Sequence, residues 1–231
     1  MLVLPFLLVA QTDSTEAPAA DSAASGKPAA EAPELISPSL LFIAVQKSDK
    51  SIDFRATLSA KVNKQSYNLY KLKVSFYRVT GDQDQELGFV ITDGSGKAVL
   101  NIKADSLTPD TEGKLQFKAV FAGNKAMESA EEMIAFKKAK LEINPVKEDS
   151  LLSVFVKLVD LGSGEEIPVK DAAVGIYVKR LFLPQKVGEG TTDESGEFTV
   201  EFPNGLPGDA KGNLTILARI DENETYGYLE A

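Results

Sequence analysis

The sequence predicts an all-β protein with two β-sandwich domains in tandem. Apolar and polar residues alternate with a period of two along several segments, which is typical of half-buried strands. In addition, the segment Gly88–Gly96, GFVITDGSG, returns 100 residues later as Gly188–Gly196, GEGTTDESG. Solenoid repeats are only about 20–50 residues long, whereas a period of this size fits one independently folding β-sandwich. The 231 residues are enough for two such domains.

The duplication extends into both flanks of this motif. At the same offset, Leu41, Ile43, Lys47, Asp49, Leu58, Val74 and Tyr77 match Leu141, Ile143, Lys147, Asp149, Leu158, Val174 and Tyr177. After a deletion of one residue, Leu107, Asp110, Gly113, Leu115 and Ala119 match Leu206, Asp209, Gly212, Leu214 and Ala218. The repeat therefore covers a whole domain rather than one turn.

The repeated motif predicts a hairpin turn in each copy. The turn residues are Thr92, Asp93 and Gly96, and then Thr192, Asp193 and Gly196. An aspartate at the first position of a type I turn accepts backbone N–H bonds, and a glycine at the fourth position adopts a positive φ. Calcium or phosphate binding is an alternative, but neither turn supplies the several oxygens that calcium requires. We therefore interpret these residues as structural and expect no metal site.

The N-terminal residues predict an exported and tethered protein. The segment Met1–Ala10, MLVLPFLLVA, resembles the hydrophobic region of a secretory signal peptide, although no Lys or Arg precedes it. A first β-strand is the alternative. Residues 11–38 consist mainly of Ala, Pro, Ser, Thr and acidic residues, so they cannot offset the entropy cost of ordering. We expect a disordered linker there.

Alternation within residues 39–138 predicts the strands of the first domain. They lie within Leu40–Val45, Ile52–Ala60, Leu72–Phe76, Leu87–Ile91, Ala98–Ile102, Leu115–Phe121 and Met133–Lys138. A short helix over Ala126–Lys140 is an alternative to the last strand. Asp82, Asp84 and Glu86 have the spacing that begins a calcium loop, but its glycine and its distant glutamate are missing. A solvated hairpin tip is the favoured interpretation of that segment.

The second domain, residues 139–231, carries a pattern that resembles a known family. A Pro-Val pair precedes a small residue and an alternating strand, followed by Thr-Asp-x-x-Gly and an aromatic residue. The residues are Pro168, Val169, Ala172, Val174, Thr192, Asp193, Gly196 and Phe198. This pattern is similar to the transthyretin-like or carboxypeptidase-regulatory-like branch of the immunoglobulin-like sandwiches. The resemblance implies two tandem immunoglobulin-like β-sandwich domains of bacterial type after the disordered linker. It implies spacing, adhesion or presentation rather than an activity.

Ligand-binding candidates are few and lie in the second domain. Lys179–Lys186, KRLFLPQK, carries Leu181, Phe182 and Leu183, which extend a buried strand or form an exposed patch; we expect burial. The surface candidates are Arg180, Phe182 and Tyr226. The repeat register places Glu230 opposite Glu131. We therefore expect the second sandwich to lack a counterpart of Met133–Lys138, the last strand of the first sandwich. Its sheet edge could then accept a strand from another chain.

Composition excludes most catalytic chemistry. The chain contains no histidine and no cysteine, which removes Ser-His and Cys-His pairs and the usual zinc ligands. A net charge of −9 disfavours nucleic acid and anionic membrane surfaces as partners. We therefore expect a non-catalytic protein without a cofactor, exported to the periplasm, the cell surface or the medium. It would act as a spacer, presentation or adhesion module toward a protein or polysaccharide of the cell envelope, and a membrane anchor could lie outside this chain.

Two alternatives to the spacer interpretation remain. The chain could be a carbohydrate- or peptide-binding accessory module of a larger secreted or membrane-anchored system. It could also be a strand-accepting assembly subunit. An enzyme that uses carboxylates alone is disfavoured, because no Asp or Glu pair has a recognisable spacing.

Overall fold

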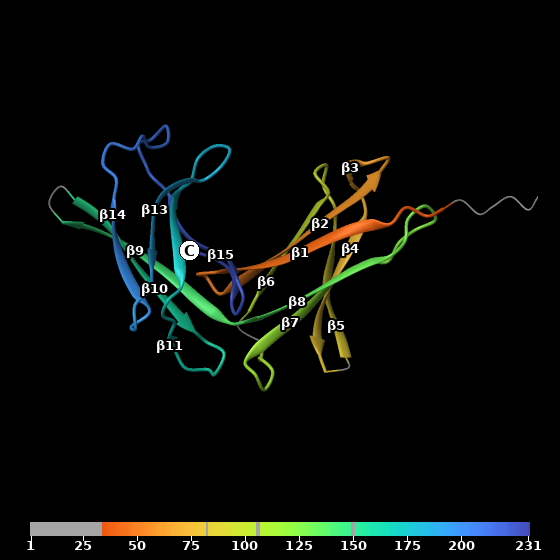
Figure 1. Ribbon diagram of the computed structural model, residues 1–231, viewed down its shortest axis with the longest axis horizontal. Helices are drawn as coiled ribbons and strands as arrows, with labels where there is room; N and C mark the ends of the chain where they lie inside the picture. Colours follow the sequence, from red (N-terminus) through yellow and green to blue (C-terminus); the bar gives the residue numbers. More distant parts are fainter. Residues whose placement is uncertain (1–33, 82, 105–106, 149–150) are drawn as a thin grey trace, which may run out of the picture. The chain divides into compact units, whose positions relative to one another are not determined.

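The computed structural model describes residues 34–81, 83–104, 107–148 and 151–231, and these residues form an all-β fold without a helix (Figure 1). The predicted signal-like segment 1–10 and residues 11–33 of the predicted linker lie outside the described residues. The described end of that linker is already attached to the fold, because Ile36 donates its N–H to the Ala126 carbonyl and accepts one from Glu128. Ile36 thus bonds to the first sandwich, and the predicted linker bounds, 11–38, stay a prediction.

Strands β1–β8 form the N-terminal sandwich. Within the described residues they are β1 (Pro38–Lys47), β2 (Ser51–Val62), β3 (Gln65–Asn68), β4 (Lys73–Thr80), β5 (Gln83–Ile91), β6 (Lys97–Lys103), β7 (Lys114–Phe121) and β8 (Ala130–Lys137). One sheet has the order β5-β4-β7-β8, and in the other β2 pairs with β1, β3 and β6. All of these pairs are antiparallel.

Strands β9–β16 form the C-terminal sandwich. In the described part of the chain they are β9 (Ala139–Glu148), β10 (Leu151–Asp160), β11 (Ile167–Pro168), β12 (Ala173–Val178), β13 (Gln185–Thr191), β14 (Glu197–Phe202), β15 (Ile216–Asn223) and β16 (Gly227–Glu230). Strand β10 pairs with β9, β11 and β14, and the second sheet has the order β13-β12-β15-β16. The result is two tandem sandwiches of the immunoglobulin-like class. The predicted boundaries, 39–138 and 139–231, stay a prediction, because Glu34–Ala231 forms one compact unit.

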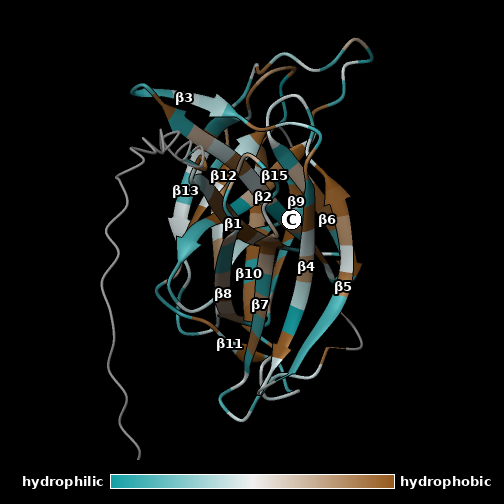
Figure 2. Cartoon of the chain, turned by 90° about the vertical axis from the view of Figure 1, so that its right-hand side faces the viewer, coloured by the Kyte–Doolittle hydropathy of each residue, from teal (hydrophilic) through white to brown (hydrophobic). Residues whose placement is uncertain are grey.

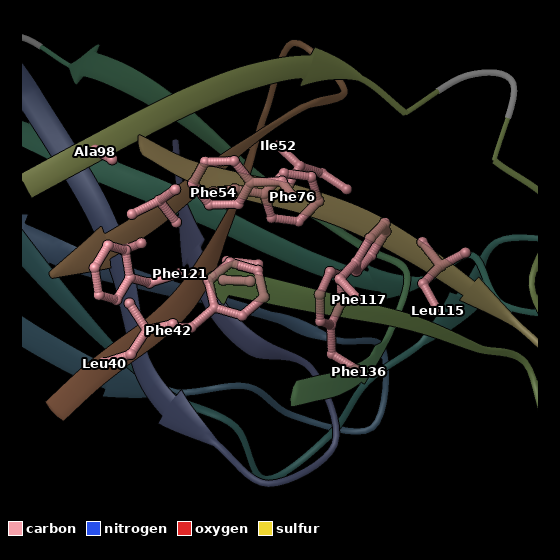
Figure 3. Packing of buried hydrophobic residues seen from close by; sticks show 14 of the residues in the cluster. Leu40, Phe42, Ile52, Phe54, Phe76, Ala98, Leu115, Phe117, Phe121 and Phe136 are labelled. Carbon is pink, nitrogen blue, oxygen red and sulfur yellow. The ribbon is translucent and has the colours of Figure 1, made fainter. Parts of the chain in front are cut away.

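Each sandwich has its own hydrophobic core. The N-terminal core contains five phenylalanines whose neighbouring ring centroids lie 4.5–6.2 Å apart (Figure 3): Phe42, Phe54, Phe76, Phe117 and Phe136. The C-terminal core is mainly aliphatic, with Val154, Val156, Leu158, Val174 and Ile176 at its centre. Inward and outward residues alternate along the strands, visible as brown and teal bands in Figure 2. The period of two thus has its expected cause, the burial of one face of each sheet.

The backbone repeats as the sequence does. Strands β5 and β13 carry a β-bulge at the same place: Leu87 is the extra residue opposite Phe76 and Tyr77, and Val187 is the extra residue opposite Ile176 and Tyr177. The cross-strand neighbours also correspond: Ser75 lies opposite Phe89 and Val120, and Gly175 lies opposite Glu189 and Arg219. The two copies therefore share register as well as strand order over these strands.

The two repeated Asp turns form as predicted at the local level. Asp93 Oδ1 accepts hydrogen bonds from the Ser95 N–H at 2.8 Å, the Ser95 hydroxyl at 2.7 Å and the Lys97 N–H at 3.0 Å. Asp193 Oδ1 accepts the equivalent bonds from Ser195 and Glu197 at 2.9–3.0 Å. These bonds to the charged form hold the pKa of both aspartates below the usual range.

These turns are not hairpins, so that part of the prediction was wrong. Strand β5 pairs with β4, whereas β6 pairs with β2 in the other sheet, and β13 and β14 are separated in the same way. Each turn carries the chain from one sheet of a sandwich to the other. Thr92 fixes the start of the crossing, because its buried hydroxyl donates to the Leu69 carbonyl at 2.7 Å and accepts the Leu72 N–H at 3.1 Å.

Glycine is required at the end of each crossing for steric reasons. Gly96 has a φ of 74°, and a Cβ there would lie 2.5 Å from the carbonyl oxygen of Leu58. Gly196 has a φ of 73° and the same 2.5 Å approach to Leu158. The crossing chain thus approaches the opposite sheet too closely for any side chain.

Two further expectations for the first domain need correction. The helical alternative for Ala126–Lys140 is wrong, because Ala130–Lys137 is strand β8 and pairs with β7 along its whole length. This strand starts three residues before the predicted segment. In the segment considered as a calcium loop, Asp84 lies within β5 and forms an ion pair with Lys118 on β7. Asp82 lies outside the described residues.

Candidate functional site

The junction between the two sandwiches is the most elaborate polar arrangement of the described chain. Only Lys138 separates β8 from β9. In Figure 1 the green ribbon passes directly from β8 into β9. Its carbonyl accepts the Leu161 N–H at 2.8 Å, and its ammonium donates to the Ala104 carbonyl at 3.0 Å. The connecting residue is therefore bonded to both sandwiches.

Gln46 is the central residue of this junction. Its side-chain amide donates to the Lys137 carbonyl at 3.0 Å and to the Tyr226 carbonyl at 2.9 Å, while its oxygen accepts the Ala139 N–H at 3.0 Å. Gln46 is 4% exposed. This buried amide thus bonds to two segments, the β8–β9 connection and the turn between β15 and β16, and moving either one away would leave buried polar groups unpaired.

A sheet also runs through the junction. The end of β1 pairs in parallel with β16, with Val45 opposite Tyr228 and Lys47 opposite Glu230. The Ser48 N–H donates to the Glu230 carbonyl at 3.2 Å, which extends the pairing by one bond. Strands of both sandwiches thus belong to one hydrogen-bonded sheet, β13-β12-β15-β16-β1-β2-β3.

Five charged side chains lie along the same junction. Glu230 forms ion pairs with Lys47 and with Arg219 at 2.6 Å, and Asp53 forms ion pairs with Lys47 at 3.5 Å and with Arg55 at 3.0 Å. Burial alone would raise the pKa of Glu230, but the hydrogen bond and charge of Lys47, together with Arg219, outweigh it and hold this pKa below the usual range. The network therefore stabilises the junction in its ionised form.

Tyr226, a predicted ligand-binding candidate, belongs to this junction. Its hydroxyl donates to Asp160 Oδ2 at 3.0 Å, and its carbonyl is one of the acceptors of Gln46. Burial, followed by the hydrogen bond and charge of Asp160, raises the pKa of Tyr226 to about 12. The side chain is half-buried, and its contacts are those of a structural residue.

The other two candidates, Arg180 and Phe182, lie in the loop between β12 and β13. Lys179 at its start bonds to Thr215, just before β15, whereas Tyr226 follows the opposite end of β15. The three candidates therefore do not form one site. Arg180 donates to Gln185 Oε1 at 3.0 Å and to the Pro207 carbonyl, which ties this loop to the loop before β15.

The expected burial of the apolar loop was wrong. Leu181, Phe182 and Leu183 are 90%, 90% and 78% exposed. Strand β12 ends at Val178, so these residues do not continue it into the core. The three side chains form an exposed apolar tip on the C-terminal sandwich.

The described residues contain neither a cluster of metal ligands nor a membrane-spanning helix. No group of three or more Asp, Glu, His or Cys side chains there is arranged to hold a metal ion. Across the same described residues, no helix has the length and apolar character needed to cross a membrane.

Comparison with known proteins gave no match by sequence and only weak similarity to solved structures. No protein-family model and no curated protein matches the chain. A tetra-tandem repeat from the extending region of a large adhesion protein is 11% identical over 85% of this chain, with a TM-score of 0.30. This chain spans about half, 47%, of that structure.

Two other solved structures are similar at the same level. The D0–D1 domains of Intimin are 20% identical over 83% of this chain and 96% of theirs, with a TM-score of 0.29. A bacterial ice-binding adhesin is 8% identical over 85% of this chain and 63% of its own, with a TM-score of 0.30.

Sequence reasoning missed Gln46, because the repeat shows only that Gln46 and Val146 differ, and their burial is known from the structure. Gln46 follows the apolar run Leu40–Val45, and the position 100 residues later is Val146, which lies on the exposed edge of β9. Gln46 is polar but buried, whereas Val146 is apolar but exposed, which is the reverse of what burial alone would favour. Such a mismatch indicates a contact that only one copy makes.

Proposed function

We propose that this chain is a non-catalytic, exported cell-envelope module whose two sandwiches form a stiff spacer that presents binding surfaces to a partner. The observation that carries the proposal is the junction around Gln46. Domains joined by a flexible linker move relative to one another by default. Here a buried side chain, a shared sheet and an ion network all connect the two sandwiches. A junction of this kind suits a protein whose task is to hold a fixed distance.

The export part of this proposal is supported by the signal-like segment and the linker-like composition before Ile36. The resemblance of the second domain to transthyretin-like sandwiches supports presentation rather than catalysis. Fractionation of the native host, combined with proteolysis of intact cells, tests export directly. Recovery of the full-length protein in the cytosol alone would contradict it.

Stiffness can be measured through the distance between two spin labels. The chain contains no cysteine, so Lys61→Cys and Glu194→Cys would place one label on each sandwich at exposed positions. We expect a single narrow distance distribution that broadens when Gln46 is replaced. A broad distribution in the parent double-cysteine protein would refute the stiff spacer.

A second candidate function, a peptide- or carbohydrate-binding accessory module, is supported by the exposed tip Leu181–Leu183. Phe182→Ala should then weaken binding to an envelope partner without unfolding the domain. A strand-accepting role is less favoured at β16, because β1 already pairs with Tyr228–Glu230. A strand added to β16 at these residues would have to displace β1.

A further inference from the structure

The outer face of the C-terminal sandwich contains a hollow of about 440 Å³ over β12, β13 and β15. The side chains that carry its chemistry are Tyr177, Lys186, Glu189, Arg219 and Asp221. Small-molecule sites usually measure about 300–1,000 Å³ and combine an apolar surface with a few polar groups. The hollow has both the size and the mixed lining of such a site.

The floor of the hollow is an aromatic ring lying over a glycine. A Cβ added at Gly175 would be 2.6 Å from Cε2 of Tyr177 and 2.9 Å from its hydroxyl oxygen. The ring can occupy this place only because residue 175 has no side chain. The guanidinium of Arg219 lies 5.6 Å from the ring centroid, which helps to hold the ring along the sheet. The result is a flat aromatic surface within the hollow.

The charges around this ring are arranged in pairs. Lys186 pairs with Glu189, and Arg219 pairs with Glu230. Among the described residues, Asp221 forms no ion pair within 4.0 Å. An anionic ligand would therefore meet two cations that already have carboxylate partners, and it would also meet the Asp221 carboxylate, which repels it. A neutral ligand with many hydroxyls would find both hydrogen-bond donors and acceptors.

The N-terminal sandwich shows what the same place looks like without these groups. In that copy Ser75 replaces Gly175, and Phe89 replaces Glu189. Lys73 lies over the Phe89 ring at 4.3 Å, so a lysine on an apolar ring stands where the second copy has the Glu189 carboxylate. The glycine under the ring and the carboxylate at its rim are thus properties of the second copy and not of the fold.

We infer that this hollow binds a neutral saccharide unit, with one face of the sugar ring stacked on Tyr177. The C–H groups of a sugar face are apolar and suit the negative face of the aromatic ring. Its hydroxyls would donate to the carboxylates of Asp221 and Glu189 and accept from Lys186 and Arg219. This inference goes beyond the spacer function and does not depend on the stiffness of the junction.

The test uses the ¹⁵N-labelled full chain and defined sugars. Methyl glycosides of glucose, galactose, mannose and N-acetylglucosamine serve as neutral probes, and methyl glucuronide serves as the acidic one. We expect at least one neutral glycoside to shift the amide signals of Gly175, Glu189 and Arg219, and to bind more tightly than the glucuronide. An absence of shifts at about 50 mM of every neutral probe would overturn the inference, since that limits any affinity to a negligible level. Tighter binding of the glucuronide would overturn it as well.

Variants separate the hollow from the rest of the surface. Gly175→Ser introduces the residue of the N-terminal copy, where the fold accommodates it beside Tyr77, and it displaces the Tyr177 ring. It should weaken the neutral glycoside about tenfold, as should Asp221→Asn, because bonds to charged groups are the strong ones. The matched control Tyr77→Ala should leave the affinity unchanged. An equal loss in the control, or no loss in Gly175→Ser while the spectrum stays that of a folded protein, would refute the site.

Discussion

Replacing Gln46 by methionine should destabilise the whole molecule through its junction. Methionine has nearly the same volume and shape, so the substitution removes hydrogen bonds without opening a large cavity. Gln46 makes three of them, at 3.0, 2.9 and 3.0 Å, and is 4% exposed. A protein hydrogen bond contributes about 1 kcal/mol net, which gives a loss of about 3 kcal/mol. The substitution also leaves the buried Ala139 N–H and the carbonyls of Lys137 and Tyr226 without this partner, which adds to the loss of stability.

The assays are urea unfolding, which gives the free energy, and thermal unfolding, which gives Tm, both on the full chain and followed by tyrosine fluorescence and circular dichroism. For a protein of this size, about 3 kcal/mol corresponds to a decrease in Tm of roughly 6–12 °C. The spin-label distance between the two sandwiches should broaden in the same variant, because Lys137, Ala139 and Tyr226 lose their shared partner.

The duplicated chain supplies a matched control. Val146 occupies the position of Gln46 in the second repeat and is 37% exposed, so Val146→Met should change the free energy of unfolding by less than about 0.5 kcal/mol. If Gln46→Met unfolds at the same urea concentration as the parent protein and keeps a narrow distance distribution, the hydrogen bonds do not hold the junction and the reasoning fails.

Three further predictions follow from the contacts. Asp93→Ala and Asp193→Ala should lower the urea midpoint by similar amounts, because each aspartate makes the same three bonds; a change in only one would contradict equivalent roles. Glu230 has a pKa lowered from 4.5, so its contribution to stability is present above pH 4.5 and is lost as pH falls through the lowered pKa. Glu230→Gln should therefore flatten the acid limb of a stability-versus-pH curve, and an unchanged slope would count against the network. Phe182→Ser should leave stability within about 0.5 kcal/mol of the parent, whereas a large loss would restore the burial interpretation.

The fold class was predictable because its signals are local or repeated. Alternation located the long strands, and the 100-residue register located the equivalent turns, as the matching bonds of Asp93 and Asp193 confirm. The turn type was misassigned because an Asp-x-Ser-Gly turn has the same local bonds in a hairpin and in a crossing between sheets. Only the distant partner decides between them, and for Gly96 that partner is Leu58.

The functional surfaces were less predictable for the same reason. Gln46 bonds to residues 91, 93 and 180 positions away, and no local pattern encodes such contacts. The exposed loop was misread because apolar residues are not always inside, and a run of three does not say which face it occupies. The hollow depends on Gly175, whose role appears only when the Tyr177 ring is placed over it.

Comparison of the two copies separates what the fold requires from what each domain does. The inward positions keep their character, since Val74 and Val174 are both buried, as are Leu58 and Leu158. The outer face does not, because an apolar ring covered by a lysine in one copy corresponds to a carboxylate beside a hollow in the other. Core packing explains why the inward positions keep their character, but it does not explain the difference between the outer faces.

If the outer face of the C-terminal sandwich only had to be soluble, residues of any polar kind would serve at Gly175, including the serine of the first copy. The glycine is needed only if the Tyr177 ring must lie flat, and a flat, half-buried ring that lines a hollow is useful for stacking against a partner. The Gly175→Ser variant therefore tests a functional requirement that stability measurements would not detect.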